Sequence, residues 1–364
     1  MKAKSLSALL ILALLLALCA GCTIHINPSA GITTNDSFHY STYDNAADYT
    51  AGRFTYQAED IRAVRVYWVA GSIDLIEKNS AELSVSDSAD NRSQEAQLHS
   101  LLRDGILTIH YCASDYRGEM QSEWKQLTLE IPCGIELTIE NVSAPIQAAA
   151  LTTPQLHIAT VSGDISIDSL VGENAEFDTV SGNIEVDTAY VKTVSLNSVS
   201  GNFDWEQLTV DQLTADTVSG DLDFEFISCR EAALNTISGE TDLTLPAQGG
   251  TVRFDTASGA FITQRAYQKQ DHFYGFGPAD CKISVSSTSG AAGGGTRLRN
   301  SDEVTVHTAV RTRKPLPSAC HASSRMGTFA ARYRMPEKST FGDSPSASTI
   351  SVRATWQKPS RPPV

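Results

Sequence analysis

Apolar positions in the central part of the chain recur every 19 residues, in register with Ser-Gly pairs at Gly163, Gly182, Gly201, Gly220 and Gly239. Three apolar columns accompany these glycines: two residues before, two residues after and five residues before. In that order they contain Val161, Val180, Val199, Val218 and Ile237; Ile165, Ile184, Phe203 and Leu222; and Ile158, Phe177, Leu196, Ala215 and Leu234. Apolar residues within each run are two positions apart, which is the period of a β-strand.

This repeat predicts an all-β fold, a right-handed parallel β-solenoid (β-helix), over residues 142–290. Short strands cannot bury their inner face within one repeat, whereas stacked coils turn each column into a continuous internal ladder. Ala144 stands in the glycine position one repeat earlier, and the series continues less regularly to Gly290. We predict that the turns are formed by Gly163, Gly182, Gly201, Gly220, Gly239 and Gly259.

Two polar columns are expected on the outer surface. One directly follows the glycine and contains Asp164, Asn183, Asn202, Asp221 and Glu240. The other precedes it by four residues and contains Asp178, Asn197, Asp216, Asn235 and Asp255. Asparagine alternates with aspartate in the second column, so an amide can donate hydrogen bonds to the carboxylates on both sides. We interpret this ladder as structural. Calcium binding is the alternative, tested first at Asp178 and Asp255, although the glycine-rich nonapeptide of calcium-binding solenoids is absent.

Residues 58–141 alternate between apolar and polar positions without a regular period. Strands are expected at residues 64–68, 72–76, 83–85, 106–109 and 127–131. A short helix is expected at residues 94–102. We predict that this region forms irregular first coils and caps the apolar end of the solenoid.

The first 22 residues have the features of a signal peptide. Lys2 and Lys4 precede a short apolar run, which ends in Ala20-Gly21-Cys22. This ending resembles a lipobox, although Cys19 stands where leucine is usual. Ordinary cleavage near Ala20 is the alternative, and either route exports the protein.

Lipidation of Cys22 would anchor the protein to the outer face of the bacterial cell membrane. Acyl chains at this cysteine would insert into the bilayer while the folded domain stays in water. Residues 23–57 are polar and are expected to serve as a tether. We therefore expect the membrane to be a partner through the lipid anchor.

Charge divides the chain into an acidic body and a basic tail. The net charge is -14, and residues 296–364 contain 12 Lys and Arg against 4 Asp and Glu. The tail therefore carries +8, which leaves -22 on residues 1–295. Because phosphate contacts need clustered Lys and Arg, the acidic body argues against nucleic acid as a partner.

Besides the lipidated Cys22, five cysteines would remain after processing: Cys112, Cys133, Cys229, Cys281 and Cys320. Their number is odd and their spacing is wide, which argues against a full disulfide framework. A Cys112–Cys133 bridge is possible.

Residues 291–364 begin with a glycine run and are rich in Ser, Pro and Arg, a composition that predicts disorder. Two hypotheses account for this low-complexity segment: a wall-binding basic tail, or a translational frameshift after Gly290. We favour the frameshift, because an aspartate and another strand are expected after Ser-Gly. A repeat that continues in the alternative reading frame would support it.

An insertion at residues 263–281 interrupts the last repeats. Aromatic loops on a rigid scaffold are plausible contact sites, and the possible ligand contacts here are Tyr267, His272, Phe273, Tyr274 and Phe276. The alternative is a capping loop that covers the open C-terminal end.

The segments Val69–Leu75, Gly105–Ile109 and Leu127–Pro132, followed by successive Val-Ser-Gly-Asp/Asn repeats, resemble a bacterial domain-of-unknown-function family of cell-surface β-helical proteins and lipoproteins labelled "putative adhesin". The resemblance covers about residues 58–290. It implies the solenoid fold and a surface location. It supplies no catalytic residues, because the family's label is itself an inference from shape.

Catalysis ranks below binding among the function classes. Lys192, Arg230 and Arg253 are scattered, and His157 and His272 have no Ser or Cys partner at an identifiable motif. We therefore predict a surface-anchored, non-catalytic binding or structural module, without cofactor or metal, for an unknown envelope protein or glycan. The alternatives are an envelope-stress or sensory module that binds proteins, and a polysaccharide-active β-helix enzyme.

Overall fold

The computed structural model describes residues 38–89, 92–118, 125–258, 260–263, 266–278, 280–288 and 295–299. The predicted signal peptide, Cys22, Gly259, Gly290 and the tail beyond Arg299 lie outside these residues.

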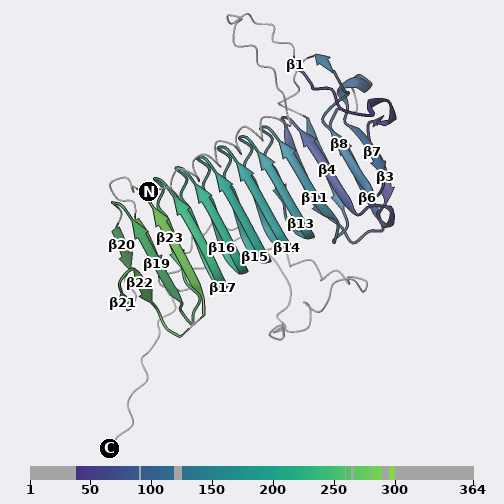
Figure 1. Ribbon diagram of the computed structural model, residues 1–364. Helices are drawn as coiled ribbons and strands as arrows, with labels where there is room; N and C mark the ends of the chain where they lie inside the picture. Colours follow the sequence, from purple (N-terminus) through teal and green to yellow (C-terminus); the bar gives the residue numbers. More distant parts are fainter. Residues whose placement is uncertain are drawn as a thin grey trace, which may run out of the picture. The chain divides into compact units, whose positions relative to one another are not determined.

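The centre of the fold is the predicted parallel β-solenoid (Figure 1). Successive coils pair in parallel with an offset of 19 residues, so that Ile165 pairs with Ile184, and Ile184 with Phe203. The long strands are β13 (Leu151–Thr160), β14 (Ile165–Thr179), β15 (Ile184–Ser198), β16 (Phe203–Thr217) and β17 (Leu222–Thr236). The offset confirms that one sequence repeat forms one turn of the solenoid.

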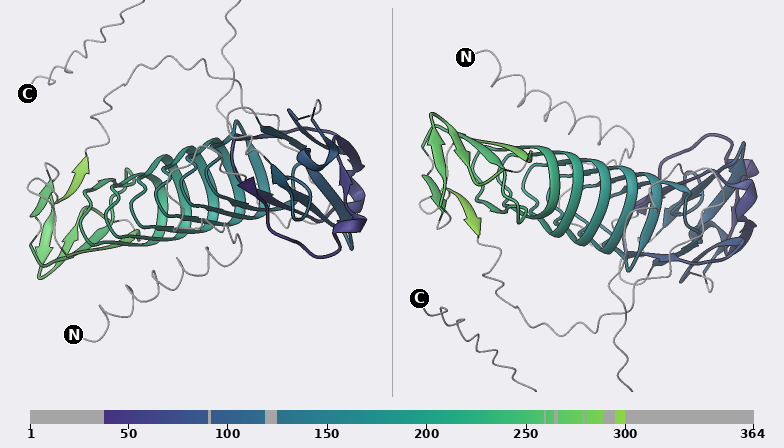
Figure 2. Two further views of the ribbon diagram at one scale, coloured as in Figure 1. Left: turned by 90° about the horizontal axis from the view of Figure 1, so that it is seen from above. Right: turned by 90° about the horizontal axis from the view of Figure 1, so that it is seen from below.

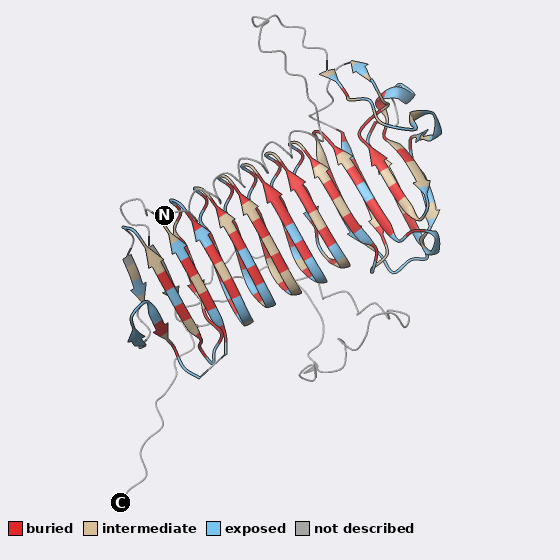
Figure 3. Cartoon of the chain, viewed as in Figure 1, coloured by how far each residue is buried: buried red, intermediate tan, exposed pale blue. Residues whose placement is uncertain are grey.

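Each coil has three segments. Pairing between β14 and β15 is interrupted at Asp168 and Glu173, which divides β14 into residues 165–167, 169–172 and 174–179. Figure 2 shows the resulting stack of coils from above and below. Burial alternates along each strand (Figure 3), and the inward side chains of β14 are Ile165, Ile167, Leu170, Ala175 and Phe177. The predicted inward column two residues before each glycine is wrong, because none of its members is buried: Val161, Val180, Val199, Val218 and Ile237. The residue three positions before each glycine is buried instead.

Close stacking of the turns explains the glycine column. A Cβ added at Gly201 would lie 2.0 Å from the carbonyl oxygen of Gly182, a distance that backbone atoms cannot tolerate. The repeat glycines from Gly163 to Gly239 do not have positive φ, so proximity rather than left-handed backbone excludes a side chain here. The amide of Gly201 donates to Ser198 Oγ at 2.7 Å, and that of Gly220 donates to Thr217 Oγ1 at 3.0 Å. A buried column of hydroxyls thus satisfies the turn amides: Thr160, Thr179, Ser198, Thr217 and Thr236.

At the N-terminal end the coils are stacked out of chain order. β4 (Ala63–Trp68) and β5 (Ser72–Glu77) pair in parallel on one side with β11 (Glu136–Asn141) and β12 (Ile146–Ala148). On the other side they pair with β8 (Ile106–His110) and β10 (Gln126–Ile131). The outer coil therefore comes later in the chain than the coil it covers.

Antiparallel strands complete this end. Those next to the outer coil are β6 (Glu82–Asp87) on β10 and β7 (His99–Arg103) on β8. Beyond them lie β3 (Phe54–Gln57) and β2 (Thr50–Ala51), while β1 (Phe38–His39) and β9 (Arg117–Gly118) form a separate pair. Single 3-10 turns are η1 (Ala46–Asp48), η2 (Ala58–Asp60) and η3 (Gln94–Ala96). These strands extend the sheets beyond the parallel coils. The predicted tether at residues 23–57 is wrong for residues 38–57, which form β1, η1, β2 and β3 and bury Tyr40.

The predicted helix at residues 94–102 is wrong. Only the 3-10 turn η3 forms there, and residues 99–103 are strand β7. Asp104 and Gly105 both have positive φ, at 52° and 74°, which is typical of an Asp-Gly hairpin turn. This turn folds β7 back onto β8 and keeps it extended.

At the C-terminal end a late strand is inserted between two earlier ones. β23 (Lys282–Ser287) lies between β17 and β19 (Thr251–Thr256), so that Val285 pairs with both Leu234 and Phe254. The coil before Gly259 therefore does not stack directly on the coil before Gly239. The remaining strands are β18 (Thr241–Thr244), β20 (Ala260–Thr263), β21 (Gln268–Gln270), β22 (Phe273–Gly275) and β24 (Gly295–Arg299).

β24 bears on the frameshift hypothesis. It pairs in parallel with β18 and β20, which makes it part of the solenoid. A strand therefore follows Gly290, as the repeat requires, whereas the expected aspartate is absent because Ala291 follows Gly290. The frameshift stays a hypothesis that the alternative reading frame tests.

The predicted Cys112–Cys133 bridge is also wrong, because Cys112 is a buried free thiol. Cys112 lies near Lys125, just before β10, whereas Cys133 follows the end of that strand. The length of β10 separates the two cysteines.

Candidate functional site

The five side chains predicted to contact a ligand fall into two groups. Tyr274 and Phe276 are buried, and the Tyr274 ring centroid lies 4.0 Å from that of Phe261. Tyr267, His272 and Phe273 are exposed. The capping alternative thus describes Tyr274 and Phe276, and ligand contact stays a prediction for the three exposed residues.

Asp255, one of the two carboxylates proposed for calcium, lies between basic groups. Its Oδ1 is 3.2 Å from His272 Nδ1, and its Oδ2 is 2.7 Å from Arg253 Nε. Both oxygens face nitrogen atoms, an arrangement that leaves little room for a calcium ion, which needs six to eight oxygen ligands.

The polar columns bind neighbouring coils together. In the column after the glycine, side-chain oxygens accept hydrogen bonds from the next coil's backbone, as Asp164 Oδ1 does from the Asn183 amide at 2.8 Å. In the second column, Asn197 Nδ2 donates to Asp178 Oδ1 at 2.9 Å, and Asn235 Nδ2 donates to Asp216 Oδ1 at 2.7 Å. Each asparagine thus links to the acid of the preceding coil, a structural role as predicted, but not to the carboxylates on both sides. Asp255 lies outside the ladder, because Ser286 of β23 separates it from Asn235.

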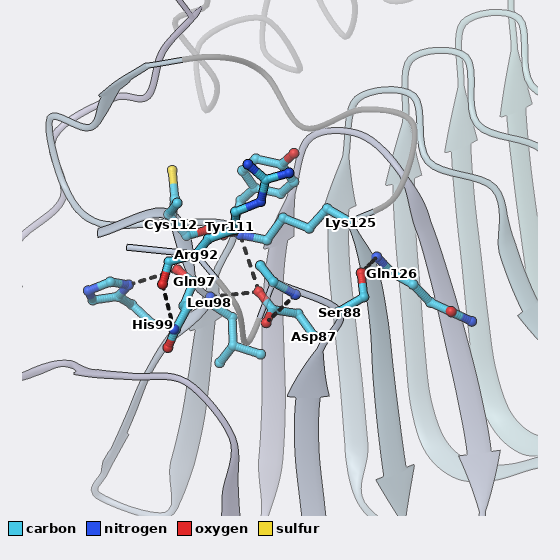
Figure 4. Close-up of polar contacts among 12 residues, drawn as sticks. Asp87, Ser88, Arg92, Gln97, Leu98, His99, Tyr111, Cys112, Lys125 and Gln126 are labelled. Carbon is cyan, nitrogen blue, oxygen red and sulfur yellow. Dashed lines mark hydrogen bonds and ion pairs between the residues drawn. The ribbon is translucent and has the colours of Figure 1, made fainter. Parts of the chain in front are cut away.

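A buried ion pair lies inside the N-terminal end (Figure 4). Lys125 Nζ is 3.2 Å from Asp87 Oδ2, and both side chains are fully inaccessible to solvent. The ammonium group also donates to the carbonyl oxygens of Ala96 and Tyr111 and lies 4.2 Å from the Tyr111 ring centroid. Burial lowers the pKa of Lys125, and the Asp87 carboxylate partly opposes that shift. Since no ligand can reach this pair, we interpret it as a structural element.

The coil segment that follows each Ser-Gly turn presents a dense array of carboxylates, here called the acidic face. It comprises Asp164, Asp168, Glu185, Asp187, Asp204, Glu206, Asp221, Asp223, Glu225, Glu240 and Asp242. The corresponding segments, from residues 164–168 to 240–244, contain no Lys or Arg. The pKa of Glu206 is raised, first by desolvation and then by neighbouring carboxylates that include Asp187 and Asp204. This side of the solenoid therefore has a strongly negative potential.

The segment before each Ser-Gly turn holds a shallow groove of about 310 Å³ that crosses several coils. Its lining includes Arg65, Glu136, Thr138, His157, Glu176 and Ser195. His157 on β13 pairs in register with Glu176 on β14, and Nδ1 of the histidine is 3.3 Å from Glu176 Oε2. The same nitrogen is 4.0 Å from Asp178 Oδ2. Desolvation raises the pKa of Asp178, the hydrogen bond from Asn197 opposes that rise, and the charge of Glu176 adds to it.

Residues 62–291 match the family described as Toastrack DUF4097. The chain belongs to this family. The match includes the solenoid, the groove and the acidic face, and it confirms the predicted resemblance to a surface-protein family of unknown function. Among curated proteins, none matches the chain. Within the described ranges, no helix has the length and apolar character needed to cross a membrane.

Three solved structures illustrate proteins similar to this Toastrack chain. A "putative adhesin" from Bacteroides fragilis is 14% identical, with 68% of this chain and 95% of that chain covered and a TM-score of 0.43. A "putative lipid binding protein" from Parabacteroides distasonis is 16% identical, with 68% and 97% covered and a TM-score of 0.43. A "putative adhesin" from Parabacteroides merdae is 11% identical, with 69% and 96% covered and a TM-score of 0.37.

Sequence reasoning missed the juxtaposition of His157 with two carboxylates. A signal was available, because Glu176 follows His157 by one period of 19 residues and Asp178 lies two positions further on the same outward face. In the sequence alone, His157 is a histidine without a Ser or Cys partner, Asp178 is part of the ladder, and Glu176 is not singled out. Only the stacking of β13 on β14 brings them together.

Proposed function

We propose that this protein is an exported, lipid-anchored and non-catalytic binding module whose acidic face binds a cationic envelope ligand. The acidic face carries the proposal, because it groups eleven carboxylates and no basic residue on the five coil segments from residues 164–168 to 240–244. Basic residues border it at its C-terminal edge, where Arg297 on β24 pairs in register with Asp242. Membership of the Toastrack family and the export signal ending at Cys22 support the envelope location.

Electrostatics favour a ligand with several positive charges. Neighbouring strands are about 4.8 Å apart, well within the screening length of about 8 Å at physiological ionic strength. The carboxylates therefore repel one another, and their charges add to the desolvation that mainly raises the pKa of Glu206. A basic peptide or an amine-bearing polymer would relieve this repulsion, and complementary charge mainly increases association rate and specificity.

The test is binding of the full chain to immobilised poly-lysine and to a neutral dextran at several salt concentrations. The variant Glu185→Gln/Asp204→Asn/Glu206→Gln neutralises the centre of the acidic face, and we expect it to weaken poly-lysine binding by about tenfold with a shallower salt dependence. The control Asp44→Asn/Glu59→Gln/Asp60→Asn removes the same charge from exposed positions at the N-terminal end. Equal losses in both variants would show that net charge, not the acidic face, determines binding.

Anchoring is tested separately. Cys22→Ser removes the predicted lipidation site, so the protein should move from the membrane fraction to the soluble fraction. Unchanged membrane association would contradict lipid anchoring without affecting the acidic face.

A further inference from the structure

The group formed by His157, Glu176 and Asp178 combines one imidazole with two carboxylates. One potential ligand atom from each of the three side chains lies within 4.8 Å of the others. Of the three residues, Asp178 is buried at 6% exposure, whereas His157 and Glu176 are accessible from the groove. The group is therefore partly enclosed by protein and open on one side.

The distances match the space a small metal ion requires. Zinc binds imidazole nitrogen and carboxylate oxygen at about 2.0–2.2 Å, which places neighbouring ligands of a tetrahedral ion about 3.4 Å apart. His157 Nδ1 is 3.3 Å from Glu176 Oε2 and 4.0 Å from Asp178 Oδ2. Small side-chain rotations would bring the three atoms onto one ion, with the fourth position open toward the groove.

The scaffold holds two of the three ligands in place. His157 and Glu176 are register partners on adjacent parallel strands, so backbone pairing fixes the separation of their Cα atoms. Asn197 Nδ2 donates to Asp178 Oδ1 and leaves Oδ2, the oxygen nearer His157, for a metal. Such outer hydrogen bonds orient metal ligands and increase affinity.

We propose that His157, Glu176 and Asp178 form a binding site for a divalent transition-metal ion, with Zn²⁺ as the best match. An imidazole with two carboxylates suits zinc and other first-row ions. Calcium is a poor match, because it prefers six to eight oxygen ligands and this group offers a nitrogen. The site lies before the Ser-Gly turn and the acidic face after it, so neither proposal depends on the other.

The direct test is calorimetric titration of the full chain, purified in detergent, with Zn²⁺ alone. We expect about one ion per chain at this site, and a loss of affinity of about a hundredfold or more in His157→Ala and in Glu176→Gln. Asn197→Ala should weaken binding by about tenfold, because it only releases Asp178. His272→Ala is the matched control, since His272 is exposed and contacts one carboxylate, that of Asp255.

Two further measurements separate this site from other zinc ligands. Co²⁺ should give a visible d–d absorption that is lost in His157→Ala and retained in Cys229→Ser/Cys281→Ser. Zn²⁺ should raise the melting temperature of the wild type and of His272→Ala, but not that of His157→Ala. Because His157 and Glu176 lie at the surface, their substitution should leave the fold intact, which circular dichroism checks.

The proposal is overturned if His157→Ala binds Zn²⁺ as tightly as the wild type. It is also overturned if the binding follows the cysteines, with a thiolate charge-transfer band from Co²⁺, or if Ca²⁺ displaces Zn²⁺ at equal concentration. None of these results would bear on poly-lysine binding by the acidic face.

Discussion

The middle of the solenoid and its N-terminal end both bury the apolar inner face of their coils, but through different contacts. From β14 to β17 every coil stacks on the previous one with an offset of 19 residues, apart from a register shift at Leu208, which pairs with Phe226. Repeated glycines, hydroxyls and amides hold each turn. At the N-terminal end β8 and β10 lie outside β4 and β5, and antiparallel strands follow. There a buried ion pair joins Asp87 at the end of β6 to Lys125 directly before β10. The middle thus depends on many small equivalent contacts, and the end on a few distinct ones.

This difference predicts where single substitutions matter most. The coil at the N-terminal end has no further repeat to stack on. Specific polar contacts, such as that of Lys125 with Asp87, stabilise this end instead. A substitution in the middle loses one of several equivalent contacts, because stability in repeat proteins is roughly a sum over neighbouring coils.

The largest effect is expected at the buried ion pair. Lys125→Met leaves Asp87 charged without its partner, which should lower the free energy of unfolding by about 3–5 kcal/mol. Lys78→Met is the control, because Lys78 makes an exposed pair with Glu130 and should cost less than about 1 kcal/mol. Urea denaturation of both variants measures the difference. Equal losses of unfolding free energy in the two variants would contradict a special role of the buried ion pair at the N-terminal end.

Acid should destabilise the N-terminal end through His110. Burial lowers the pKa of His110 to about 4, and the ring accepts or donates one hydrogen bond with Tyr40 Oη at 3.0 Å and stacks on Tyr43. In the unfolded chain this histidine has a pKa near 6.5, so between about pH 6.5 and 4 it binds a proton there but stays neutral in the folded protein. Stability should fall as the pH drops from about 6.5 to 4, by about 3 kcal/mol in total.

Comparison with His110→Phe isolates this contribution, since other groups also titrate. Urea denaturation at pH 7 and pH 4.5 should show a smaller pH-dependent loss in the variant. Hydrogen exchange should locate the additional opening in β7 and β8, with β15 and β16 protected. The same pH dependence in both proteins would exclude His110 as the cause.

A smaller effect is expected from Gly201→Ala in the middle of the solenoid. The new Cβ would lie 2.0 Å from the carbonyl oxygen of Gly182, so the neighbouring coils must separate locally, at a cost of about 1–3 kcal/mol. Gly275→Ala is the control, since its Cβ would meet an oxygen at 3.7 Å, an ordinary contact. Thermal unfolding of both variants measures the effect, and a neutral Gly201→Ala would mean that the turns are not closely stacked in solution.

Sequence periodicity predicted the middle well because each residue there repeats the environment of the residue 19 positions away. The same reasoning failed at residues 94–102, where the Asp104-Gly105 hairpin outweighed local helix tendency. Periodicity also missed the group of His157, Glu176 and Asp178. A search for columns of similar residues does not find a site that is made of different residue types.

The sequence by itself determined the coil length, two of the three predicted inward ladders, the close glycine turns and the acidic character of the body, since each follows from spacing and composition. It misplaced the column from Val161 to Ile237, which is not buried. Tertiary structure alone decided which coils are neighbours at the two ends, as with β23 between β17 and β19. It alone also placed His157 beside Glu176 and Asp178, and buried Lys125 against Asp87. The reason is that a sequence period predicts which strands pair only where consecutive repeats are also neighbours in space. Where an insertion interrupts the repeats, several strands can pair with the same exposed sheet edge, and only the folded structure shows which one does.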